Sequence, residues 1–245
     1  MAASHAPVAL VTGASRGIGK ALAESFSRHG YRLALNFNRS AREAEATAER
    51  IRGSGGEALT LKADVRDTSQ VRSMVESVVA QWGRIDVLVN NAGVARDRTL
   101  LKMSDEEWNE VIRVNLTGAF HCLRECARLM SLQKEGSILN LGSMAGVRGV
   151  FGAANYAASK AGLIALTKSA AREFGRFNVR VNAILPGFHV TGMNGAFWET
   201  RKEEILSEHV LGRLTDLSEL TEFSVVVAGL RSVSGQVFCF DSRLT

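Results

Sequence analysis

Short apolar segments alternate with longer amphipathic ones along almost the whole chain, and this alternation restricts the fold more than any other feature. The longer segments have helical spacing, and several of them end in glycine. Strands that are apolar on both faces are typical of a parallel sheet covered by helices on both sides. The segments predicted as strands are Val8–Thr12, Arg32–Phe37, Ala58–Asp64, Val87–Gly93 (a strand with its turn), Ser137–Ser143, Val179–Leu185 and Gln236–Phe240.

This pattern predicts an α/β protein with a doubly wound, Rossmann-type parallel sheet of about seven strands and helices on both faces. The chain has 245 residues and only two prolines, and no linker or internal repeat divides it. Residues 1–245 are therefore expected to form a single domain. Long helices are expected at Ser69–Trp82, at Tyr156–Phe174 and at Asp105–Gln133, the last with a break near Gly118.

The charge and hydropathy of the chain argue against several classes of partner. The formal net charge is +5, but no run of five or more like charges occurs. Nucleic-acid-binding proteins usually gather Lys and Arg into one stripe, so no nucleic-acid partner is expected. The N-terminal segment lacks a secretory signal pattern, and no stretch of about 18 apolar residues is present. The sequence therefore predicts no membrane span and a cytoplasmic location.

Three cysteines, Cys122, Cys126 and Cys239, are too few and too scattered for a disulfide framework. Cys122 and Cys126 lie four residues apart on one face of a predicted helix. This spacing favours two small buried hydrophobic side chains over a metal site. No C-x-x-C motif or Cys/His cluster accompanies them, so no metal is expected.

A glycine-rich turn, "TGASRGIG" (Thr12–Gly19), follows the first predicted strand and opens the first predicted helix. Glycines at this position let the backbone approach a pyrophosphate, whose charge then meets a helix N-terminus. The spacing is G-x-x-x-G-x-G and differs from the usual dinucleotide fingerprint, and tight strand-to-helix turns need glycine anyway. The position of the turn favours dinucleotide binding over a turn of purely structural importance.

The end of the second predicted strand indicates which dinucleotide is bound. An NAD site usually carries an Asp or Glu about 20 residues after the glycine turn, where it bonds the ribose 2′-hydroxyl. Asn38 and Arg39 stand there instead, and Arg16 lies inside the glycine turn. Two guanidinium groups suit a 2′-phosphate, so the sequence favours NADP(H). Arg39 could equally be an ordinary exposed surface arginine.

Several motifs occur together in an order that identifies a family. "TGASRGIG", "NNAG" (Asn90–Gly93), Asn115, Ser143, "YAASK" (Tyr156–Lys160) and "PG" (Pro186–Gly187) follow one another as in short-chain dehydrogenases and reductases. The chain resembles this family over nearly its whole length. Within the family it is most similar to 3-oxoacyl-acyl-carrier-protein reductases, as "YAASKAGLIALTKSAARE", "VRVNAILPGF" and "SGQV" indicate.

The resemblance implies a complete cofactor site for NADP(H). The glycines of the first turn would lie under the pyrophosphate, Asp64 by the adenine, and Thr191 at the nicotinamide carboxamide. The cofactor-binding residues it implies are Gly13, Ser15, Arg16, Gly17, Ile18, Gly19, Asn38, Arg39, Asp64, Val65, Asn91, Ala92, Gly93, Tyr156, Lys160, Pro186, Gly187 and Thr191.

The resemblance also implies a catalytic set, Asn115, Ser143, Tyr156 and Lys160, and physical chemistry agrees with it. A carbonyl that accepts a hydride needs a proton, and a free tyrosine has a pKa of about 10. An ammonium one helical turn away, at Lys160, would lower that pKa and could hold the nicotinamide ribose. Ser143 would donate a hydrogen bond to the substrate oxygen. In the family, Asn115 would hold a water between Lys160 and solvent. Taken singly, the Tyr/Lys pair is often a solvated helix face, and such a serine a helix cap.

The chain departs from the family pattern near its substrate-binding and C-terminal segments. "PGFHVTGM" has Gly192 where the family has an acid, and "FDSRLT" has Ser242 and Arg243 in place of two glycines after Asp241. Residues 193–210 are expected to form a lid over the substrate. Within it, Phe197 and Trp198 would line an acyl or aromatic pocket or else pack in the core.

These observations lead to one main function and two alternatives. The main hypothesis is NADPH-dependent reduction of a 3-oxoacyl thioester, carried by acyl carrier protein, to the 3-hydroxyacyl form in fatty acid synthesis. The first alternative is a reductase of another ketone, a quinone or an acyl-CoA. The second is a catalytically silent binding subunit, which the complete catalytic set argues against.

Two kinds of macromolecular partner are expected. The resemblance suggests that Lys134 and Arg176 dock the acidic carrier protein near the mouth of the site, although two solvated helix-end charges would look the same in sequence. Small and apolar residues in the predicted helices at 105–133 and 156–174 suggest a homotetramer or a dimer.

Overall fold

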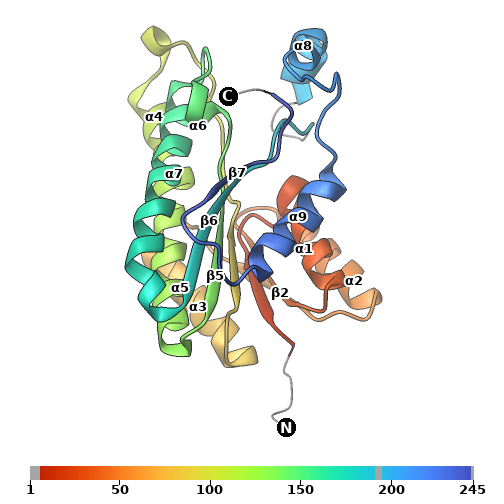
Figure 1. Cartoon of the computed structure of the whole chain (residues 1–245), viewed down its shortest axis with the longest axis vertical. Helices are drawn as coiled ribbons and strands as arrows, with labels where there is room; N and C mark the ends of the chain where they lie inside the picture. The colour runs from red at the N-terminus through yellow and green to blue at the C-terminus, as the bar shows by residue number, and fades with distance from the viewer. Residues whose placement is uncertain (1–5, 191–194, 244–245) are drawn as a thin grey trace.

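The computed structural model describes residues 6–190 and 195–243, without the side chains of residues 195–197. Within these residues seven strands form one parallel sheet in the order β3-β2-β1-β4-β5-β6-β7. The predicted fold class is therefore confirmed (Figure 1). The strands are β1 Val8–Val11, β2 Arg32–Phe37, β3 Ala58–Lys62, β4 Val87–Asn90, β5 Gly136–Leu141, β6 Val179–Leu185 and β7 Val237–Cys239.

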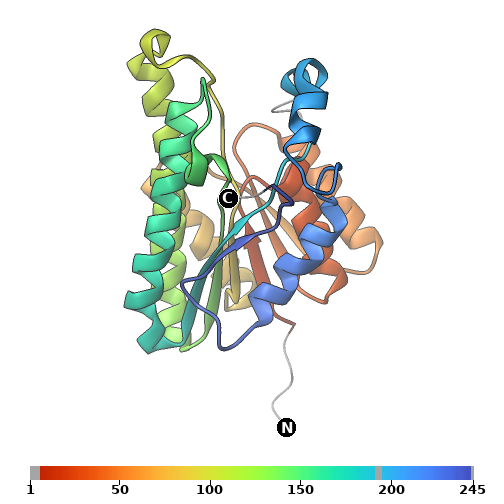
Figure 2. The same cartoon turned by 45° about the horizontal axis from the view of Figure 1, so that its top comes forward.

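The helices cover both faces of the sheet, as the doubly wound pattern requires (Figures 1 and 2). One face packs against α1 (Gly17–Arg28), α2 (Ala41–Gly53) and α9 (Leu217–Gly229). The other packs against α3 (Thr68–Trp82), α5 (Ala119–Gln133) and α7 (Ala154–Phe174).

Alternate residues of β1 show how one strand serves two cores. Val8 and Leu10 join the apolar cluster under α3 and α5, whereas Ala9 and Val11 join the cluster under α1 and α9. Successive side chains of a strand point to opposite sides, and helices cover both sides of the sheet, so both faces of the strand are apolar. Most side chains on both faces are apolar, and this explains the nearly continuous apolar runs in the sequence. A few polar side chains, Asn36 in β2 among them, are buried within the strands.

Cys122 and Cys126 are fully buried on α5 and belong to the first of these cores. Burial raises the pKa of the Cys122 thiol to about 12. The interpretation of the pair as small hydrophobic side chains is confirmed. Among the described residues, no His, Cys, Asp and Glu side chains gather into a group that could hold a metal ion. None of the described helices has the length and apolarity needed to cross a membrane.

The break predicted near Gly118 is confirmed, and it takes the form of a π turn. α4 (Asp105–Ile112) continues into a π-helical segment, Arg113–Gly118, before α5 begins. A Cβ at Gly118 would lie 2.5 Å from Cγ2 of Val65, so glycine allows the close packing at this point. π turns inside helices often mark functional sites, and this one contains Asn115.

Several elements gather beyond the carboxyl ends of the strands. In Figure 1, α4 and the short helix α6 (Ala145–Arg148) lie on one side of this end, and α8 (Gly195–Ser207) lies on the other. α8 is kinked, because the backbone of Arg201 is not helical. Parallel α/β sheets bind ligands at this end, so the candidate site is expected here. Met193, at the start of the predicted lid, lies outside the described residues.

Candidate active site

Hydrogen bonds from two neighbouring segments fix the backbone of the glycine turn between β1 and α1. Gly13 and Gly17 have positive φ angles, 64° and 56°, which explains the glycines there. Asn36, buried in β2, accepts a hydrogen bond from the Gly13 amide (3.4 Å), and its own carbonyl accepts one from the Ala14 amide (2.9 Å). Asn36 also donates to the carbonyl of Ala63 (3.0 Å). Asn36 was missed from sequence, although a polar residue inside an apolar strand is a visible signal.

Asn91 fixes the same turn from β4. Its side-chain amide donates to the carbonyls of Thr12 (2.9 Å) and Gly13 (3.1 Å). The Thr12 hydroxyl accepts the amides of Asn91 and Ala92, both at 3.0 Å. A Cβ at Gly19 would lie 2.3 Å from Nδ2 of Asn91, so any larger residue would break this arrangement. Asn91 therefore shapes the cofactor cradle, with Thr12 as a partner that sequence reasoning missed.

The cradle fits the phosphates of a dinucleotide. α1 begins at Gly17 with no side-chain cap and no acidic residue in its first turn, so its N-terminal amides and its dipole face outward. Arg16 and Arg39 are exposed, and neither guanidinium forms an ion pair within the described part of the chain. An anion can therefore be bound by backbone amides and by two free guanidinium groups.

The predicted adenine-side residues gather at the end of β3. Arg66 donates to both carboxylate oxygens of Asp64 (2.9 and 3.0 Å from Nε), and this pairing, supported by a hydrogen bond from Asn38, keeps the pKa of Asp64 below its usual value. Val65 is buried beside the pair, and its carbonyl is 3.1 Å from Nδ1 of His121. Arg66 was not predicted, and its role is to orient Asp64.

Asn115 joins the π turn to two neighbouring segments. Its side chain accepts the Val94 amide (2.8 Å) and donates to the Val94 carbonyl (3.0 Å), which aligns the chain just beyond Gly93. It also donates to the hydroxyl of Ser159 (3.2 Å), which in turn donates to the Tyr156 carbonyl (2.7 Å). Asn115 thus links the β4 turn to the first turns of α7.

Lys160 is nearly enclosed, with 5% of its surface exposed. Its ammonium donates to the carbonyl of Leu141, at the end of β5, over 2.6 Å, and lies 5.7 Å from the centre of the Tyr156 ring. Burial lowers the pKa of Lys160 to about 8. The predicted pairing of Tyr156 with Lys160 on one side of α7 is therefore present, with Lys160 buried and Tyr156 half-buried.

The pKa of Tyr156 lies above its ordinary value, opposite to the direction predicted from sequence. Burial is the main cause, because it disfavours the phenolate, and the negative charge of Asp97 adds to it. A hydrogen bond with the side chain of Ser143 acts in the other direction. Sequence showed the i, i+4 spacing but not the burial that opposes the effect of the ammonium. Asp97 was missed, because nothing in the sequence distinguishes it from other surface acids.

Ser143 reaches Tyr156 because its own turn is tightly folded. The Ser143 hydroxyl accepts the amide of Ala145 (3.2 Å), and the Ser143 carbonyl accepts the amide of Gly146 (3.0 Å). α6 then packs directly on α7 at Gly146. The hydroxyl and phenol groups predicted to act on one carbonyl oxygen thus meet in the structure.

The remaining predicted residues lie around β6 and in the following segment. Gly187 follows Pro186 with φ +81°, and a Cβ there would lie 2.5 Å from Oγ1 of Thr215. Thr191 and Gly192 lie outside the described residues. Trp198 on α8 contacts the ring of Phe188 (centroids 5.9 Å apart), whereas the side chain of Phe197 is not described.

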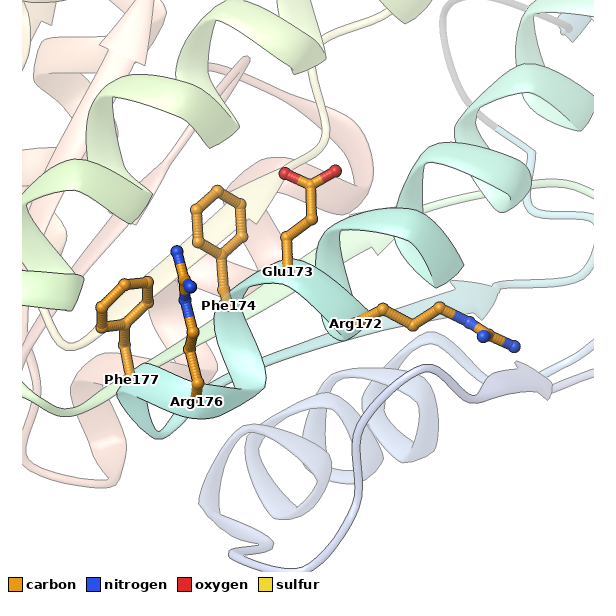
Figure 3. A pocket seen from close by; sticks show the side chains of 5 residues that line it. All are labelled: Arg172, Glu173, Phe174, Arg176 and Phe177. Atoms are coloured by element: carbon orange, nitrogen blue, oxygen red, sulfur yellow. The ribbon is translucent and has the colours of Figure 1, made fainter.

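The charged groups of Lys134 and Arg176 both lie close to one aromatic ring, that of Phe177, at the end of α7 farther from Tyr156. The Lys134 ammonium lies 4.9 Å and the Arg176 guanidinium 4.7 Å from the centre of the Phe177 ring. Arg176 lines a shallow pocket there (Figure 3), together with Arg172, Glu173, Phe174 and Phe177. With a rise of about 1.5 Å per residue, α7 separates this end from Tyr156 by about 27 Å. The expectation that both cations lie near the mouth of the chain's own site is wrong.

Comparison with known proteins gives a consistent result. A family model described as short chain dehydrogenase matches residues 7–202. The 3-oxoacyl-acyl-carrier-protein reductase of Synechocystis is 46% identical over 247 residues, covering 100% of this chain and 99% of its own. The Staphylococcus aureus enzyme of the same name is 44% identical over 88% of this chain and 89% of its own. A solved variant of actinorhodin polyketide ketoreductase with NADPH superimposes with a TM-score of 0.91 at 31% identity, covering 97% of this chain and 96% of its own.

The contact between α6 and α7 gives a direct test of how tightly the site is built. A Cβ at Gly146 would lie 2.7 Å from the Ala161 nitrogen and 2.7 Å from the Lys160 carbonyl carbon, backbone atoms that cannot rotate away. We predict that Gly146→Ala lowers the free energy of unfolding by about 1–3 kcal/mol and also lowers kcat, because α6 carries the Ser143 turn away from α7. Urea denaturation and steady-state kinetics measure the two effects.

Gly53→Ala is the matched control, because Gly53 ends α2 with nothing within 4 Å of a Cβ. It should change stability by less than about 1 kcal/mol and leave kcat alone. Equal behaviour of the two variants would show that the contact at Gly146 does not position the site.

Proposed function

The chain belongs to the short-chain dehydrogenase/reductase family, and we propose that it reduces 3-oxoacyl groups on acyl carrier protein to 3-hydroxyacyl groups with NADPH, as in fatty acid synthesis. The observation that carries the proposal is the meeting of Ser143, Tyr156 and Lys160 beside a cradle suited to a dinucleotide. The 43–46% identity to 3-oxoacyl-acyl-carrier-protein reductases supports the substrate class.

Each residue has a definite part in the reaction. NADPH, when bound, supplies the hydride. Ser143 and Tyr156 both aim hydroxyl groups at the substrate oxygen, where negative charge develops, and hydrogen bonds aimed at such a charge in a dry site are strongly stabilising. Tyr156 then gives its proton to that oxygen. A raised pKa keeps Tyr156 protonated through neutral pH, so the acid is always loaded.

Lys160 is suited to hold the cofactor and to take up and release protons. Its ammonium is fixed by the Leu141 carbonyl and could hold the nicotinamide ribose from the same place. Because its pKa is about 8, Lys160 is mostly charged at pH 7 and loses that charge as the pH rises through 8. Reduction should therefore weaken on the alkaline side. Asn115 supports this group through Ser159, and its role toward a water is part of the proposal.

The cofactor side of the proposal rests on Arg16 and Arg39. Both guanidinium groups are exposed beside the cradle, and no acid stands where an NAD enzyme needs one. The residues proposed to bind NADPH are those that the family resemblance implies, with Thr191 outside the described residues. A cytoplasmic location and a single domain with a lid over residues 193–210 stay predictions.

Exposed apolar surfaces of the single chain support the assembly that we propose. Phe120 and Leu132 on α5 and Ala161 and Ala165 on α7 are exposed although they are apolar. We propose that these helices pair between subunits in a dimer or tetramer. Light scattering at micromolar concentration should give two or four times the mass of 26.5 kDa. A stable monomer would contradict this assembly.

Oligomer formation also gives Lys134 and Arg176 a role in docking. They lie too far from Tyr156 of their own chain, but antiparallel pairing of α7 helices would bring them near the partner's site. Acyl carrier protein is acidic, so cations there would attract it. Alternatively, the two cationic side chains only stack on Phe177 and have no role in docking.

A panel of carbonyl compounds tests the proposed function and its cofactor. We predict that NADPH oxidation is fastest with acetoacetyl-acyl-carrier-protein, and that kcat/KM favours NADPH over NADH by about 1–3 kcal/mol through charge-assisted contacts to the 2′-phosphate. Arg39→Ala should remove much of that preference, whereas Arg231→Ala, on an exposed loop away from the cradle, should not.

The outcomes of the panel separate the alternatives. A much higher rate with a quinone, a sugar or a free ketone would replace the acyl-thioester assignment by another reductase activity. No oxidation of either cofactor with any compound would favour a silent binding subunit. Equal kcat/KM for NADPH and NADH would overturn the role of the two arginines.

Docking of the carrier protein has its own test. We predict that Lys134→Glu combined with Arg176→Glu lowers kcat/KM for acyl-carrier substrates by roughly tenfold, about 1.4 kcal/mol. Added salt should lower the kcat/KM of the wild-type enzyme toward the same level, because salt screens the attraction. A small uncharged thioester should be reduced as before. If both substrates lose activity equally, or neither does, these two residues do not dock the carrier.

A further inference from the structure

A fully buried asparagine stands directly before Tyr156 in the chain. Asn155 has no exposed surface (0%), and its side chain forms three hydrogen bonds. Its Oδ1 accepts the amide of Tyr156 (2.7 Å). Its Nδ2 donates to the carbonyls of Arg96 (3.0 Å) and Glu107 (3.2 Å). The catalytic set and the cofactor site described above do not include Asn155, so its role has to be found in what these bonds hold together.

The bond to Tyr156 completes the start of α7. The first backbone amides of a helix have no partner inside the helix. Ala153 precedes α7 at the capping position, and its side chain forms no capping hydrogen bond. Tyr156 occupies the third position of the helix, and Asn155 accepts its amide instead. Asn155 therefore fixes the backbone from which the catalytic phenol projects.

The other two bonds of Asn155 attach a neighbouring unit to α7. The segment Arg96–Arg98 is joined to α4 by two ion pairs, Arg96 with Glu110 (2.8 Å) and Arg98 with Glu107 (3.1 Å). Asn155 donates one hydrogen bond to the segment and one to the backbone of α4. It thus binds both parts of this unit to the start of α7, beside which α4 lies in Figure 1.

The segment Arg96–Arg98 lies against the part of α7 that carries Tyr156. The Arg98 amide donates to the Gly152 carbonyl (2.7 Å), and Arg98 pairs with Ala153 in a parallel bridge. Asp97, in the middle of the segment, is close enough for its charge to act on the Tyr156 phenol. A shift of this segment would therefore change both the support and the electrostatic surroundings of the proton donor.

We propose that Asn155 is a positioning residue for the reduction: its side-chain amide binds the Arg96–Arg98 segment and α4 to the start of α7, and so holds the Tyr156 hydroxyl at the substrate oxygen. This role rests on the proposed function, in which Tyr156 gives the proton. Misplacement of a reacting group by about 1 Å can cost about 100-fold in rate. Loss of the two donated bonds should therefore lower kcat far more than NADPH affinity.

Hydrogen exchange in the wild-type chain tests the two donated bonds without substrate or cofactor. In the ¹⁵N-labelled protein, the Nδ2 protons of Asn155 should exchange with water at least about 100-fold more slowly than those of Asn109, which is exposed on α4. This measurement does not depend on the proposed function. Equal exchange rates at the two side chains would overturn the proposal.

Kinetics of Asn155→Asp test the positioning role. The substitution keeps the size of the side chain and an oxygen that can accept the Tyr156 amide. It also replaces the donor group by an oxygen facing the carbonyls of Arg96 and Glu107. We expect kcat for acetoacetyl-acyl-carrier-protein to fall about tenfold or more, with NADPH affinity changed less than about twofold. Unchanged kcat would refute the positioning role.

The position of the Tyr156 ring can also be followed directly. The sequence contains two tyrosines, Tyr31 and Tyr156. Tyrosine labelled with ¹³C at Cζ therefore gives two resonances, which Tyr31→Phe assigns. In Asn155→Asp the Tyr156 resonance should shift or broaden, whereas that of Tyr31 should stay as in the wild type. A Tyr156 resonance identical to that of the wild type would contradict the proposal.

Asn182→Asp is the matched control. Asn182 is also fully buried (0%), but in β6, where it donates to the Val233 carbonyl (2.9 Å) and accepts the Gln236 amide (3.0 Å). Urea denaturation should show a comparable loss of stability in the two variants, whereas kcat and the Tyr156 resonance should change in Asn155→Asp alone. Equal falls in kcat would mean a purely structural effect and sink the proposal. A wild-type chain that reduces no carbonyl would refute the proposed function instead, and the two resonance measurements would then decide whether Asn155 holds Tyr156.

Discussion

The buried contact between the Lys160 ammonium and the Leu141 carbonyl is the interaction on which the site depends. It joins α7 to the end of β5, next to the turn that carries Ser143. Burial of an ammonium costs several kcal/mol, whereas one charge-assisted hydrogen bond returns about 1.5–3 kcal/mol. The difference appears as the lowered pKa of Lys160, about 8. The fold thus holds a lysine that can take up and release protons near neutral pH.

The rest of the site is arranged so that this lysine and Tyr156 share one dry space. Asn115 and Ser159 fix the first turns of α7, and the absence of a side chain at Gly146 lets α6 approach it. The same enclosure that lowers the pKa of Lys160 raises that of Tyr156. Each residue is therefore more often uncharged than in water: Tyr156 keeps its proton through neutral pH, and Lys160 releases its proton more easily than a free lysine.

Much of this could be predicted from the sequence. The parallel sheet follows from the nearly continuous apolar strands. The cradle follows from the glycines after the first strand, two of which have positive φ angles in the structure. The direction of the Tyr156 pKa could not be predicted, because spacing shows which groups are neighbours and not how deeply they lie. Lys134 and Arg176 were placed wrongly because the length of α7 separates them from Tyr156. Arg66 acts through Asp64, and no sequence motif marks it, whereas Asn36 is visible in the sequence as a polar residue within an apolar strand.

The central claim is that the Tyr156 hydroxyl donates the proton in an otherwise prebuilt site. Tyr156→Phe keeps the aromatic ring and removes only that hydroxyl group. The account predicts at least a ~100-fold fall in kcat for acetoacetyl-acyl-carrier-protein, with NADPH affinity measured by fluorescence titration little changed. Turnover near the wild-type value in this variant would contradict the account and remove Tyr156 from the mechanism.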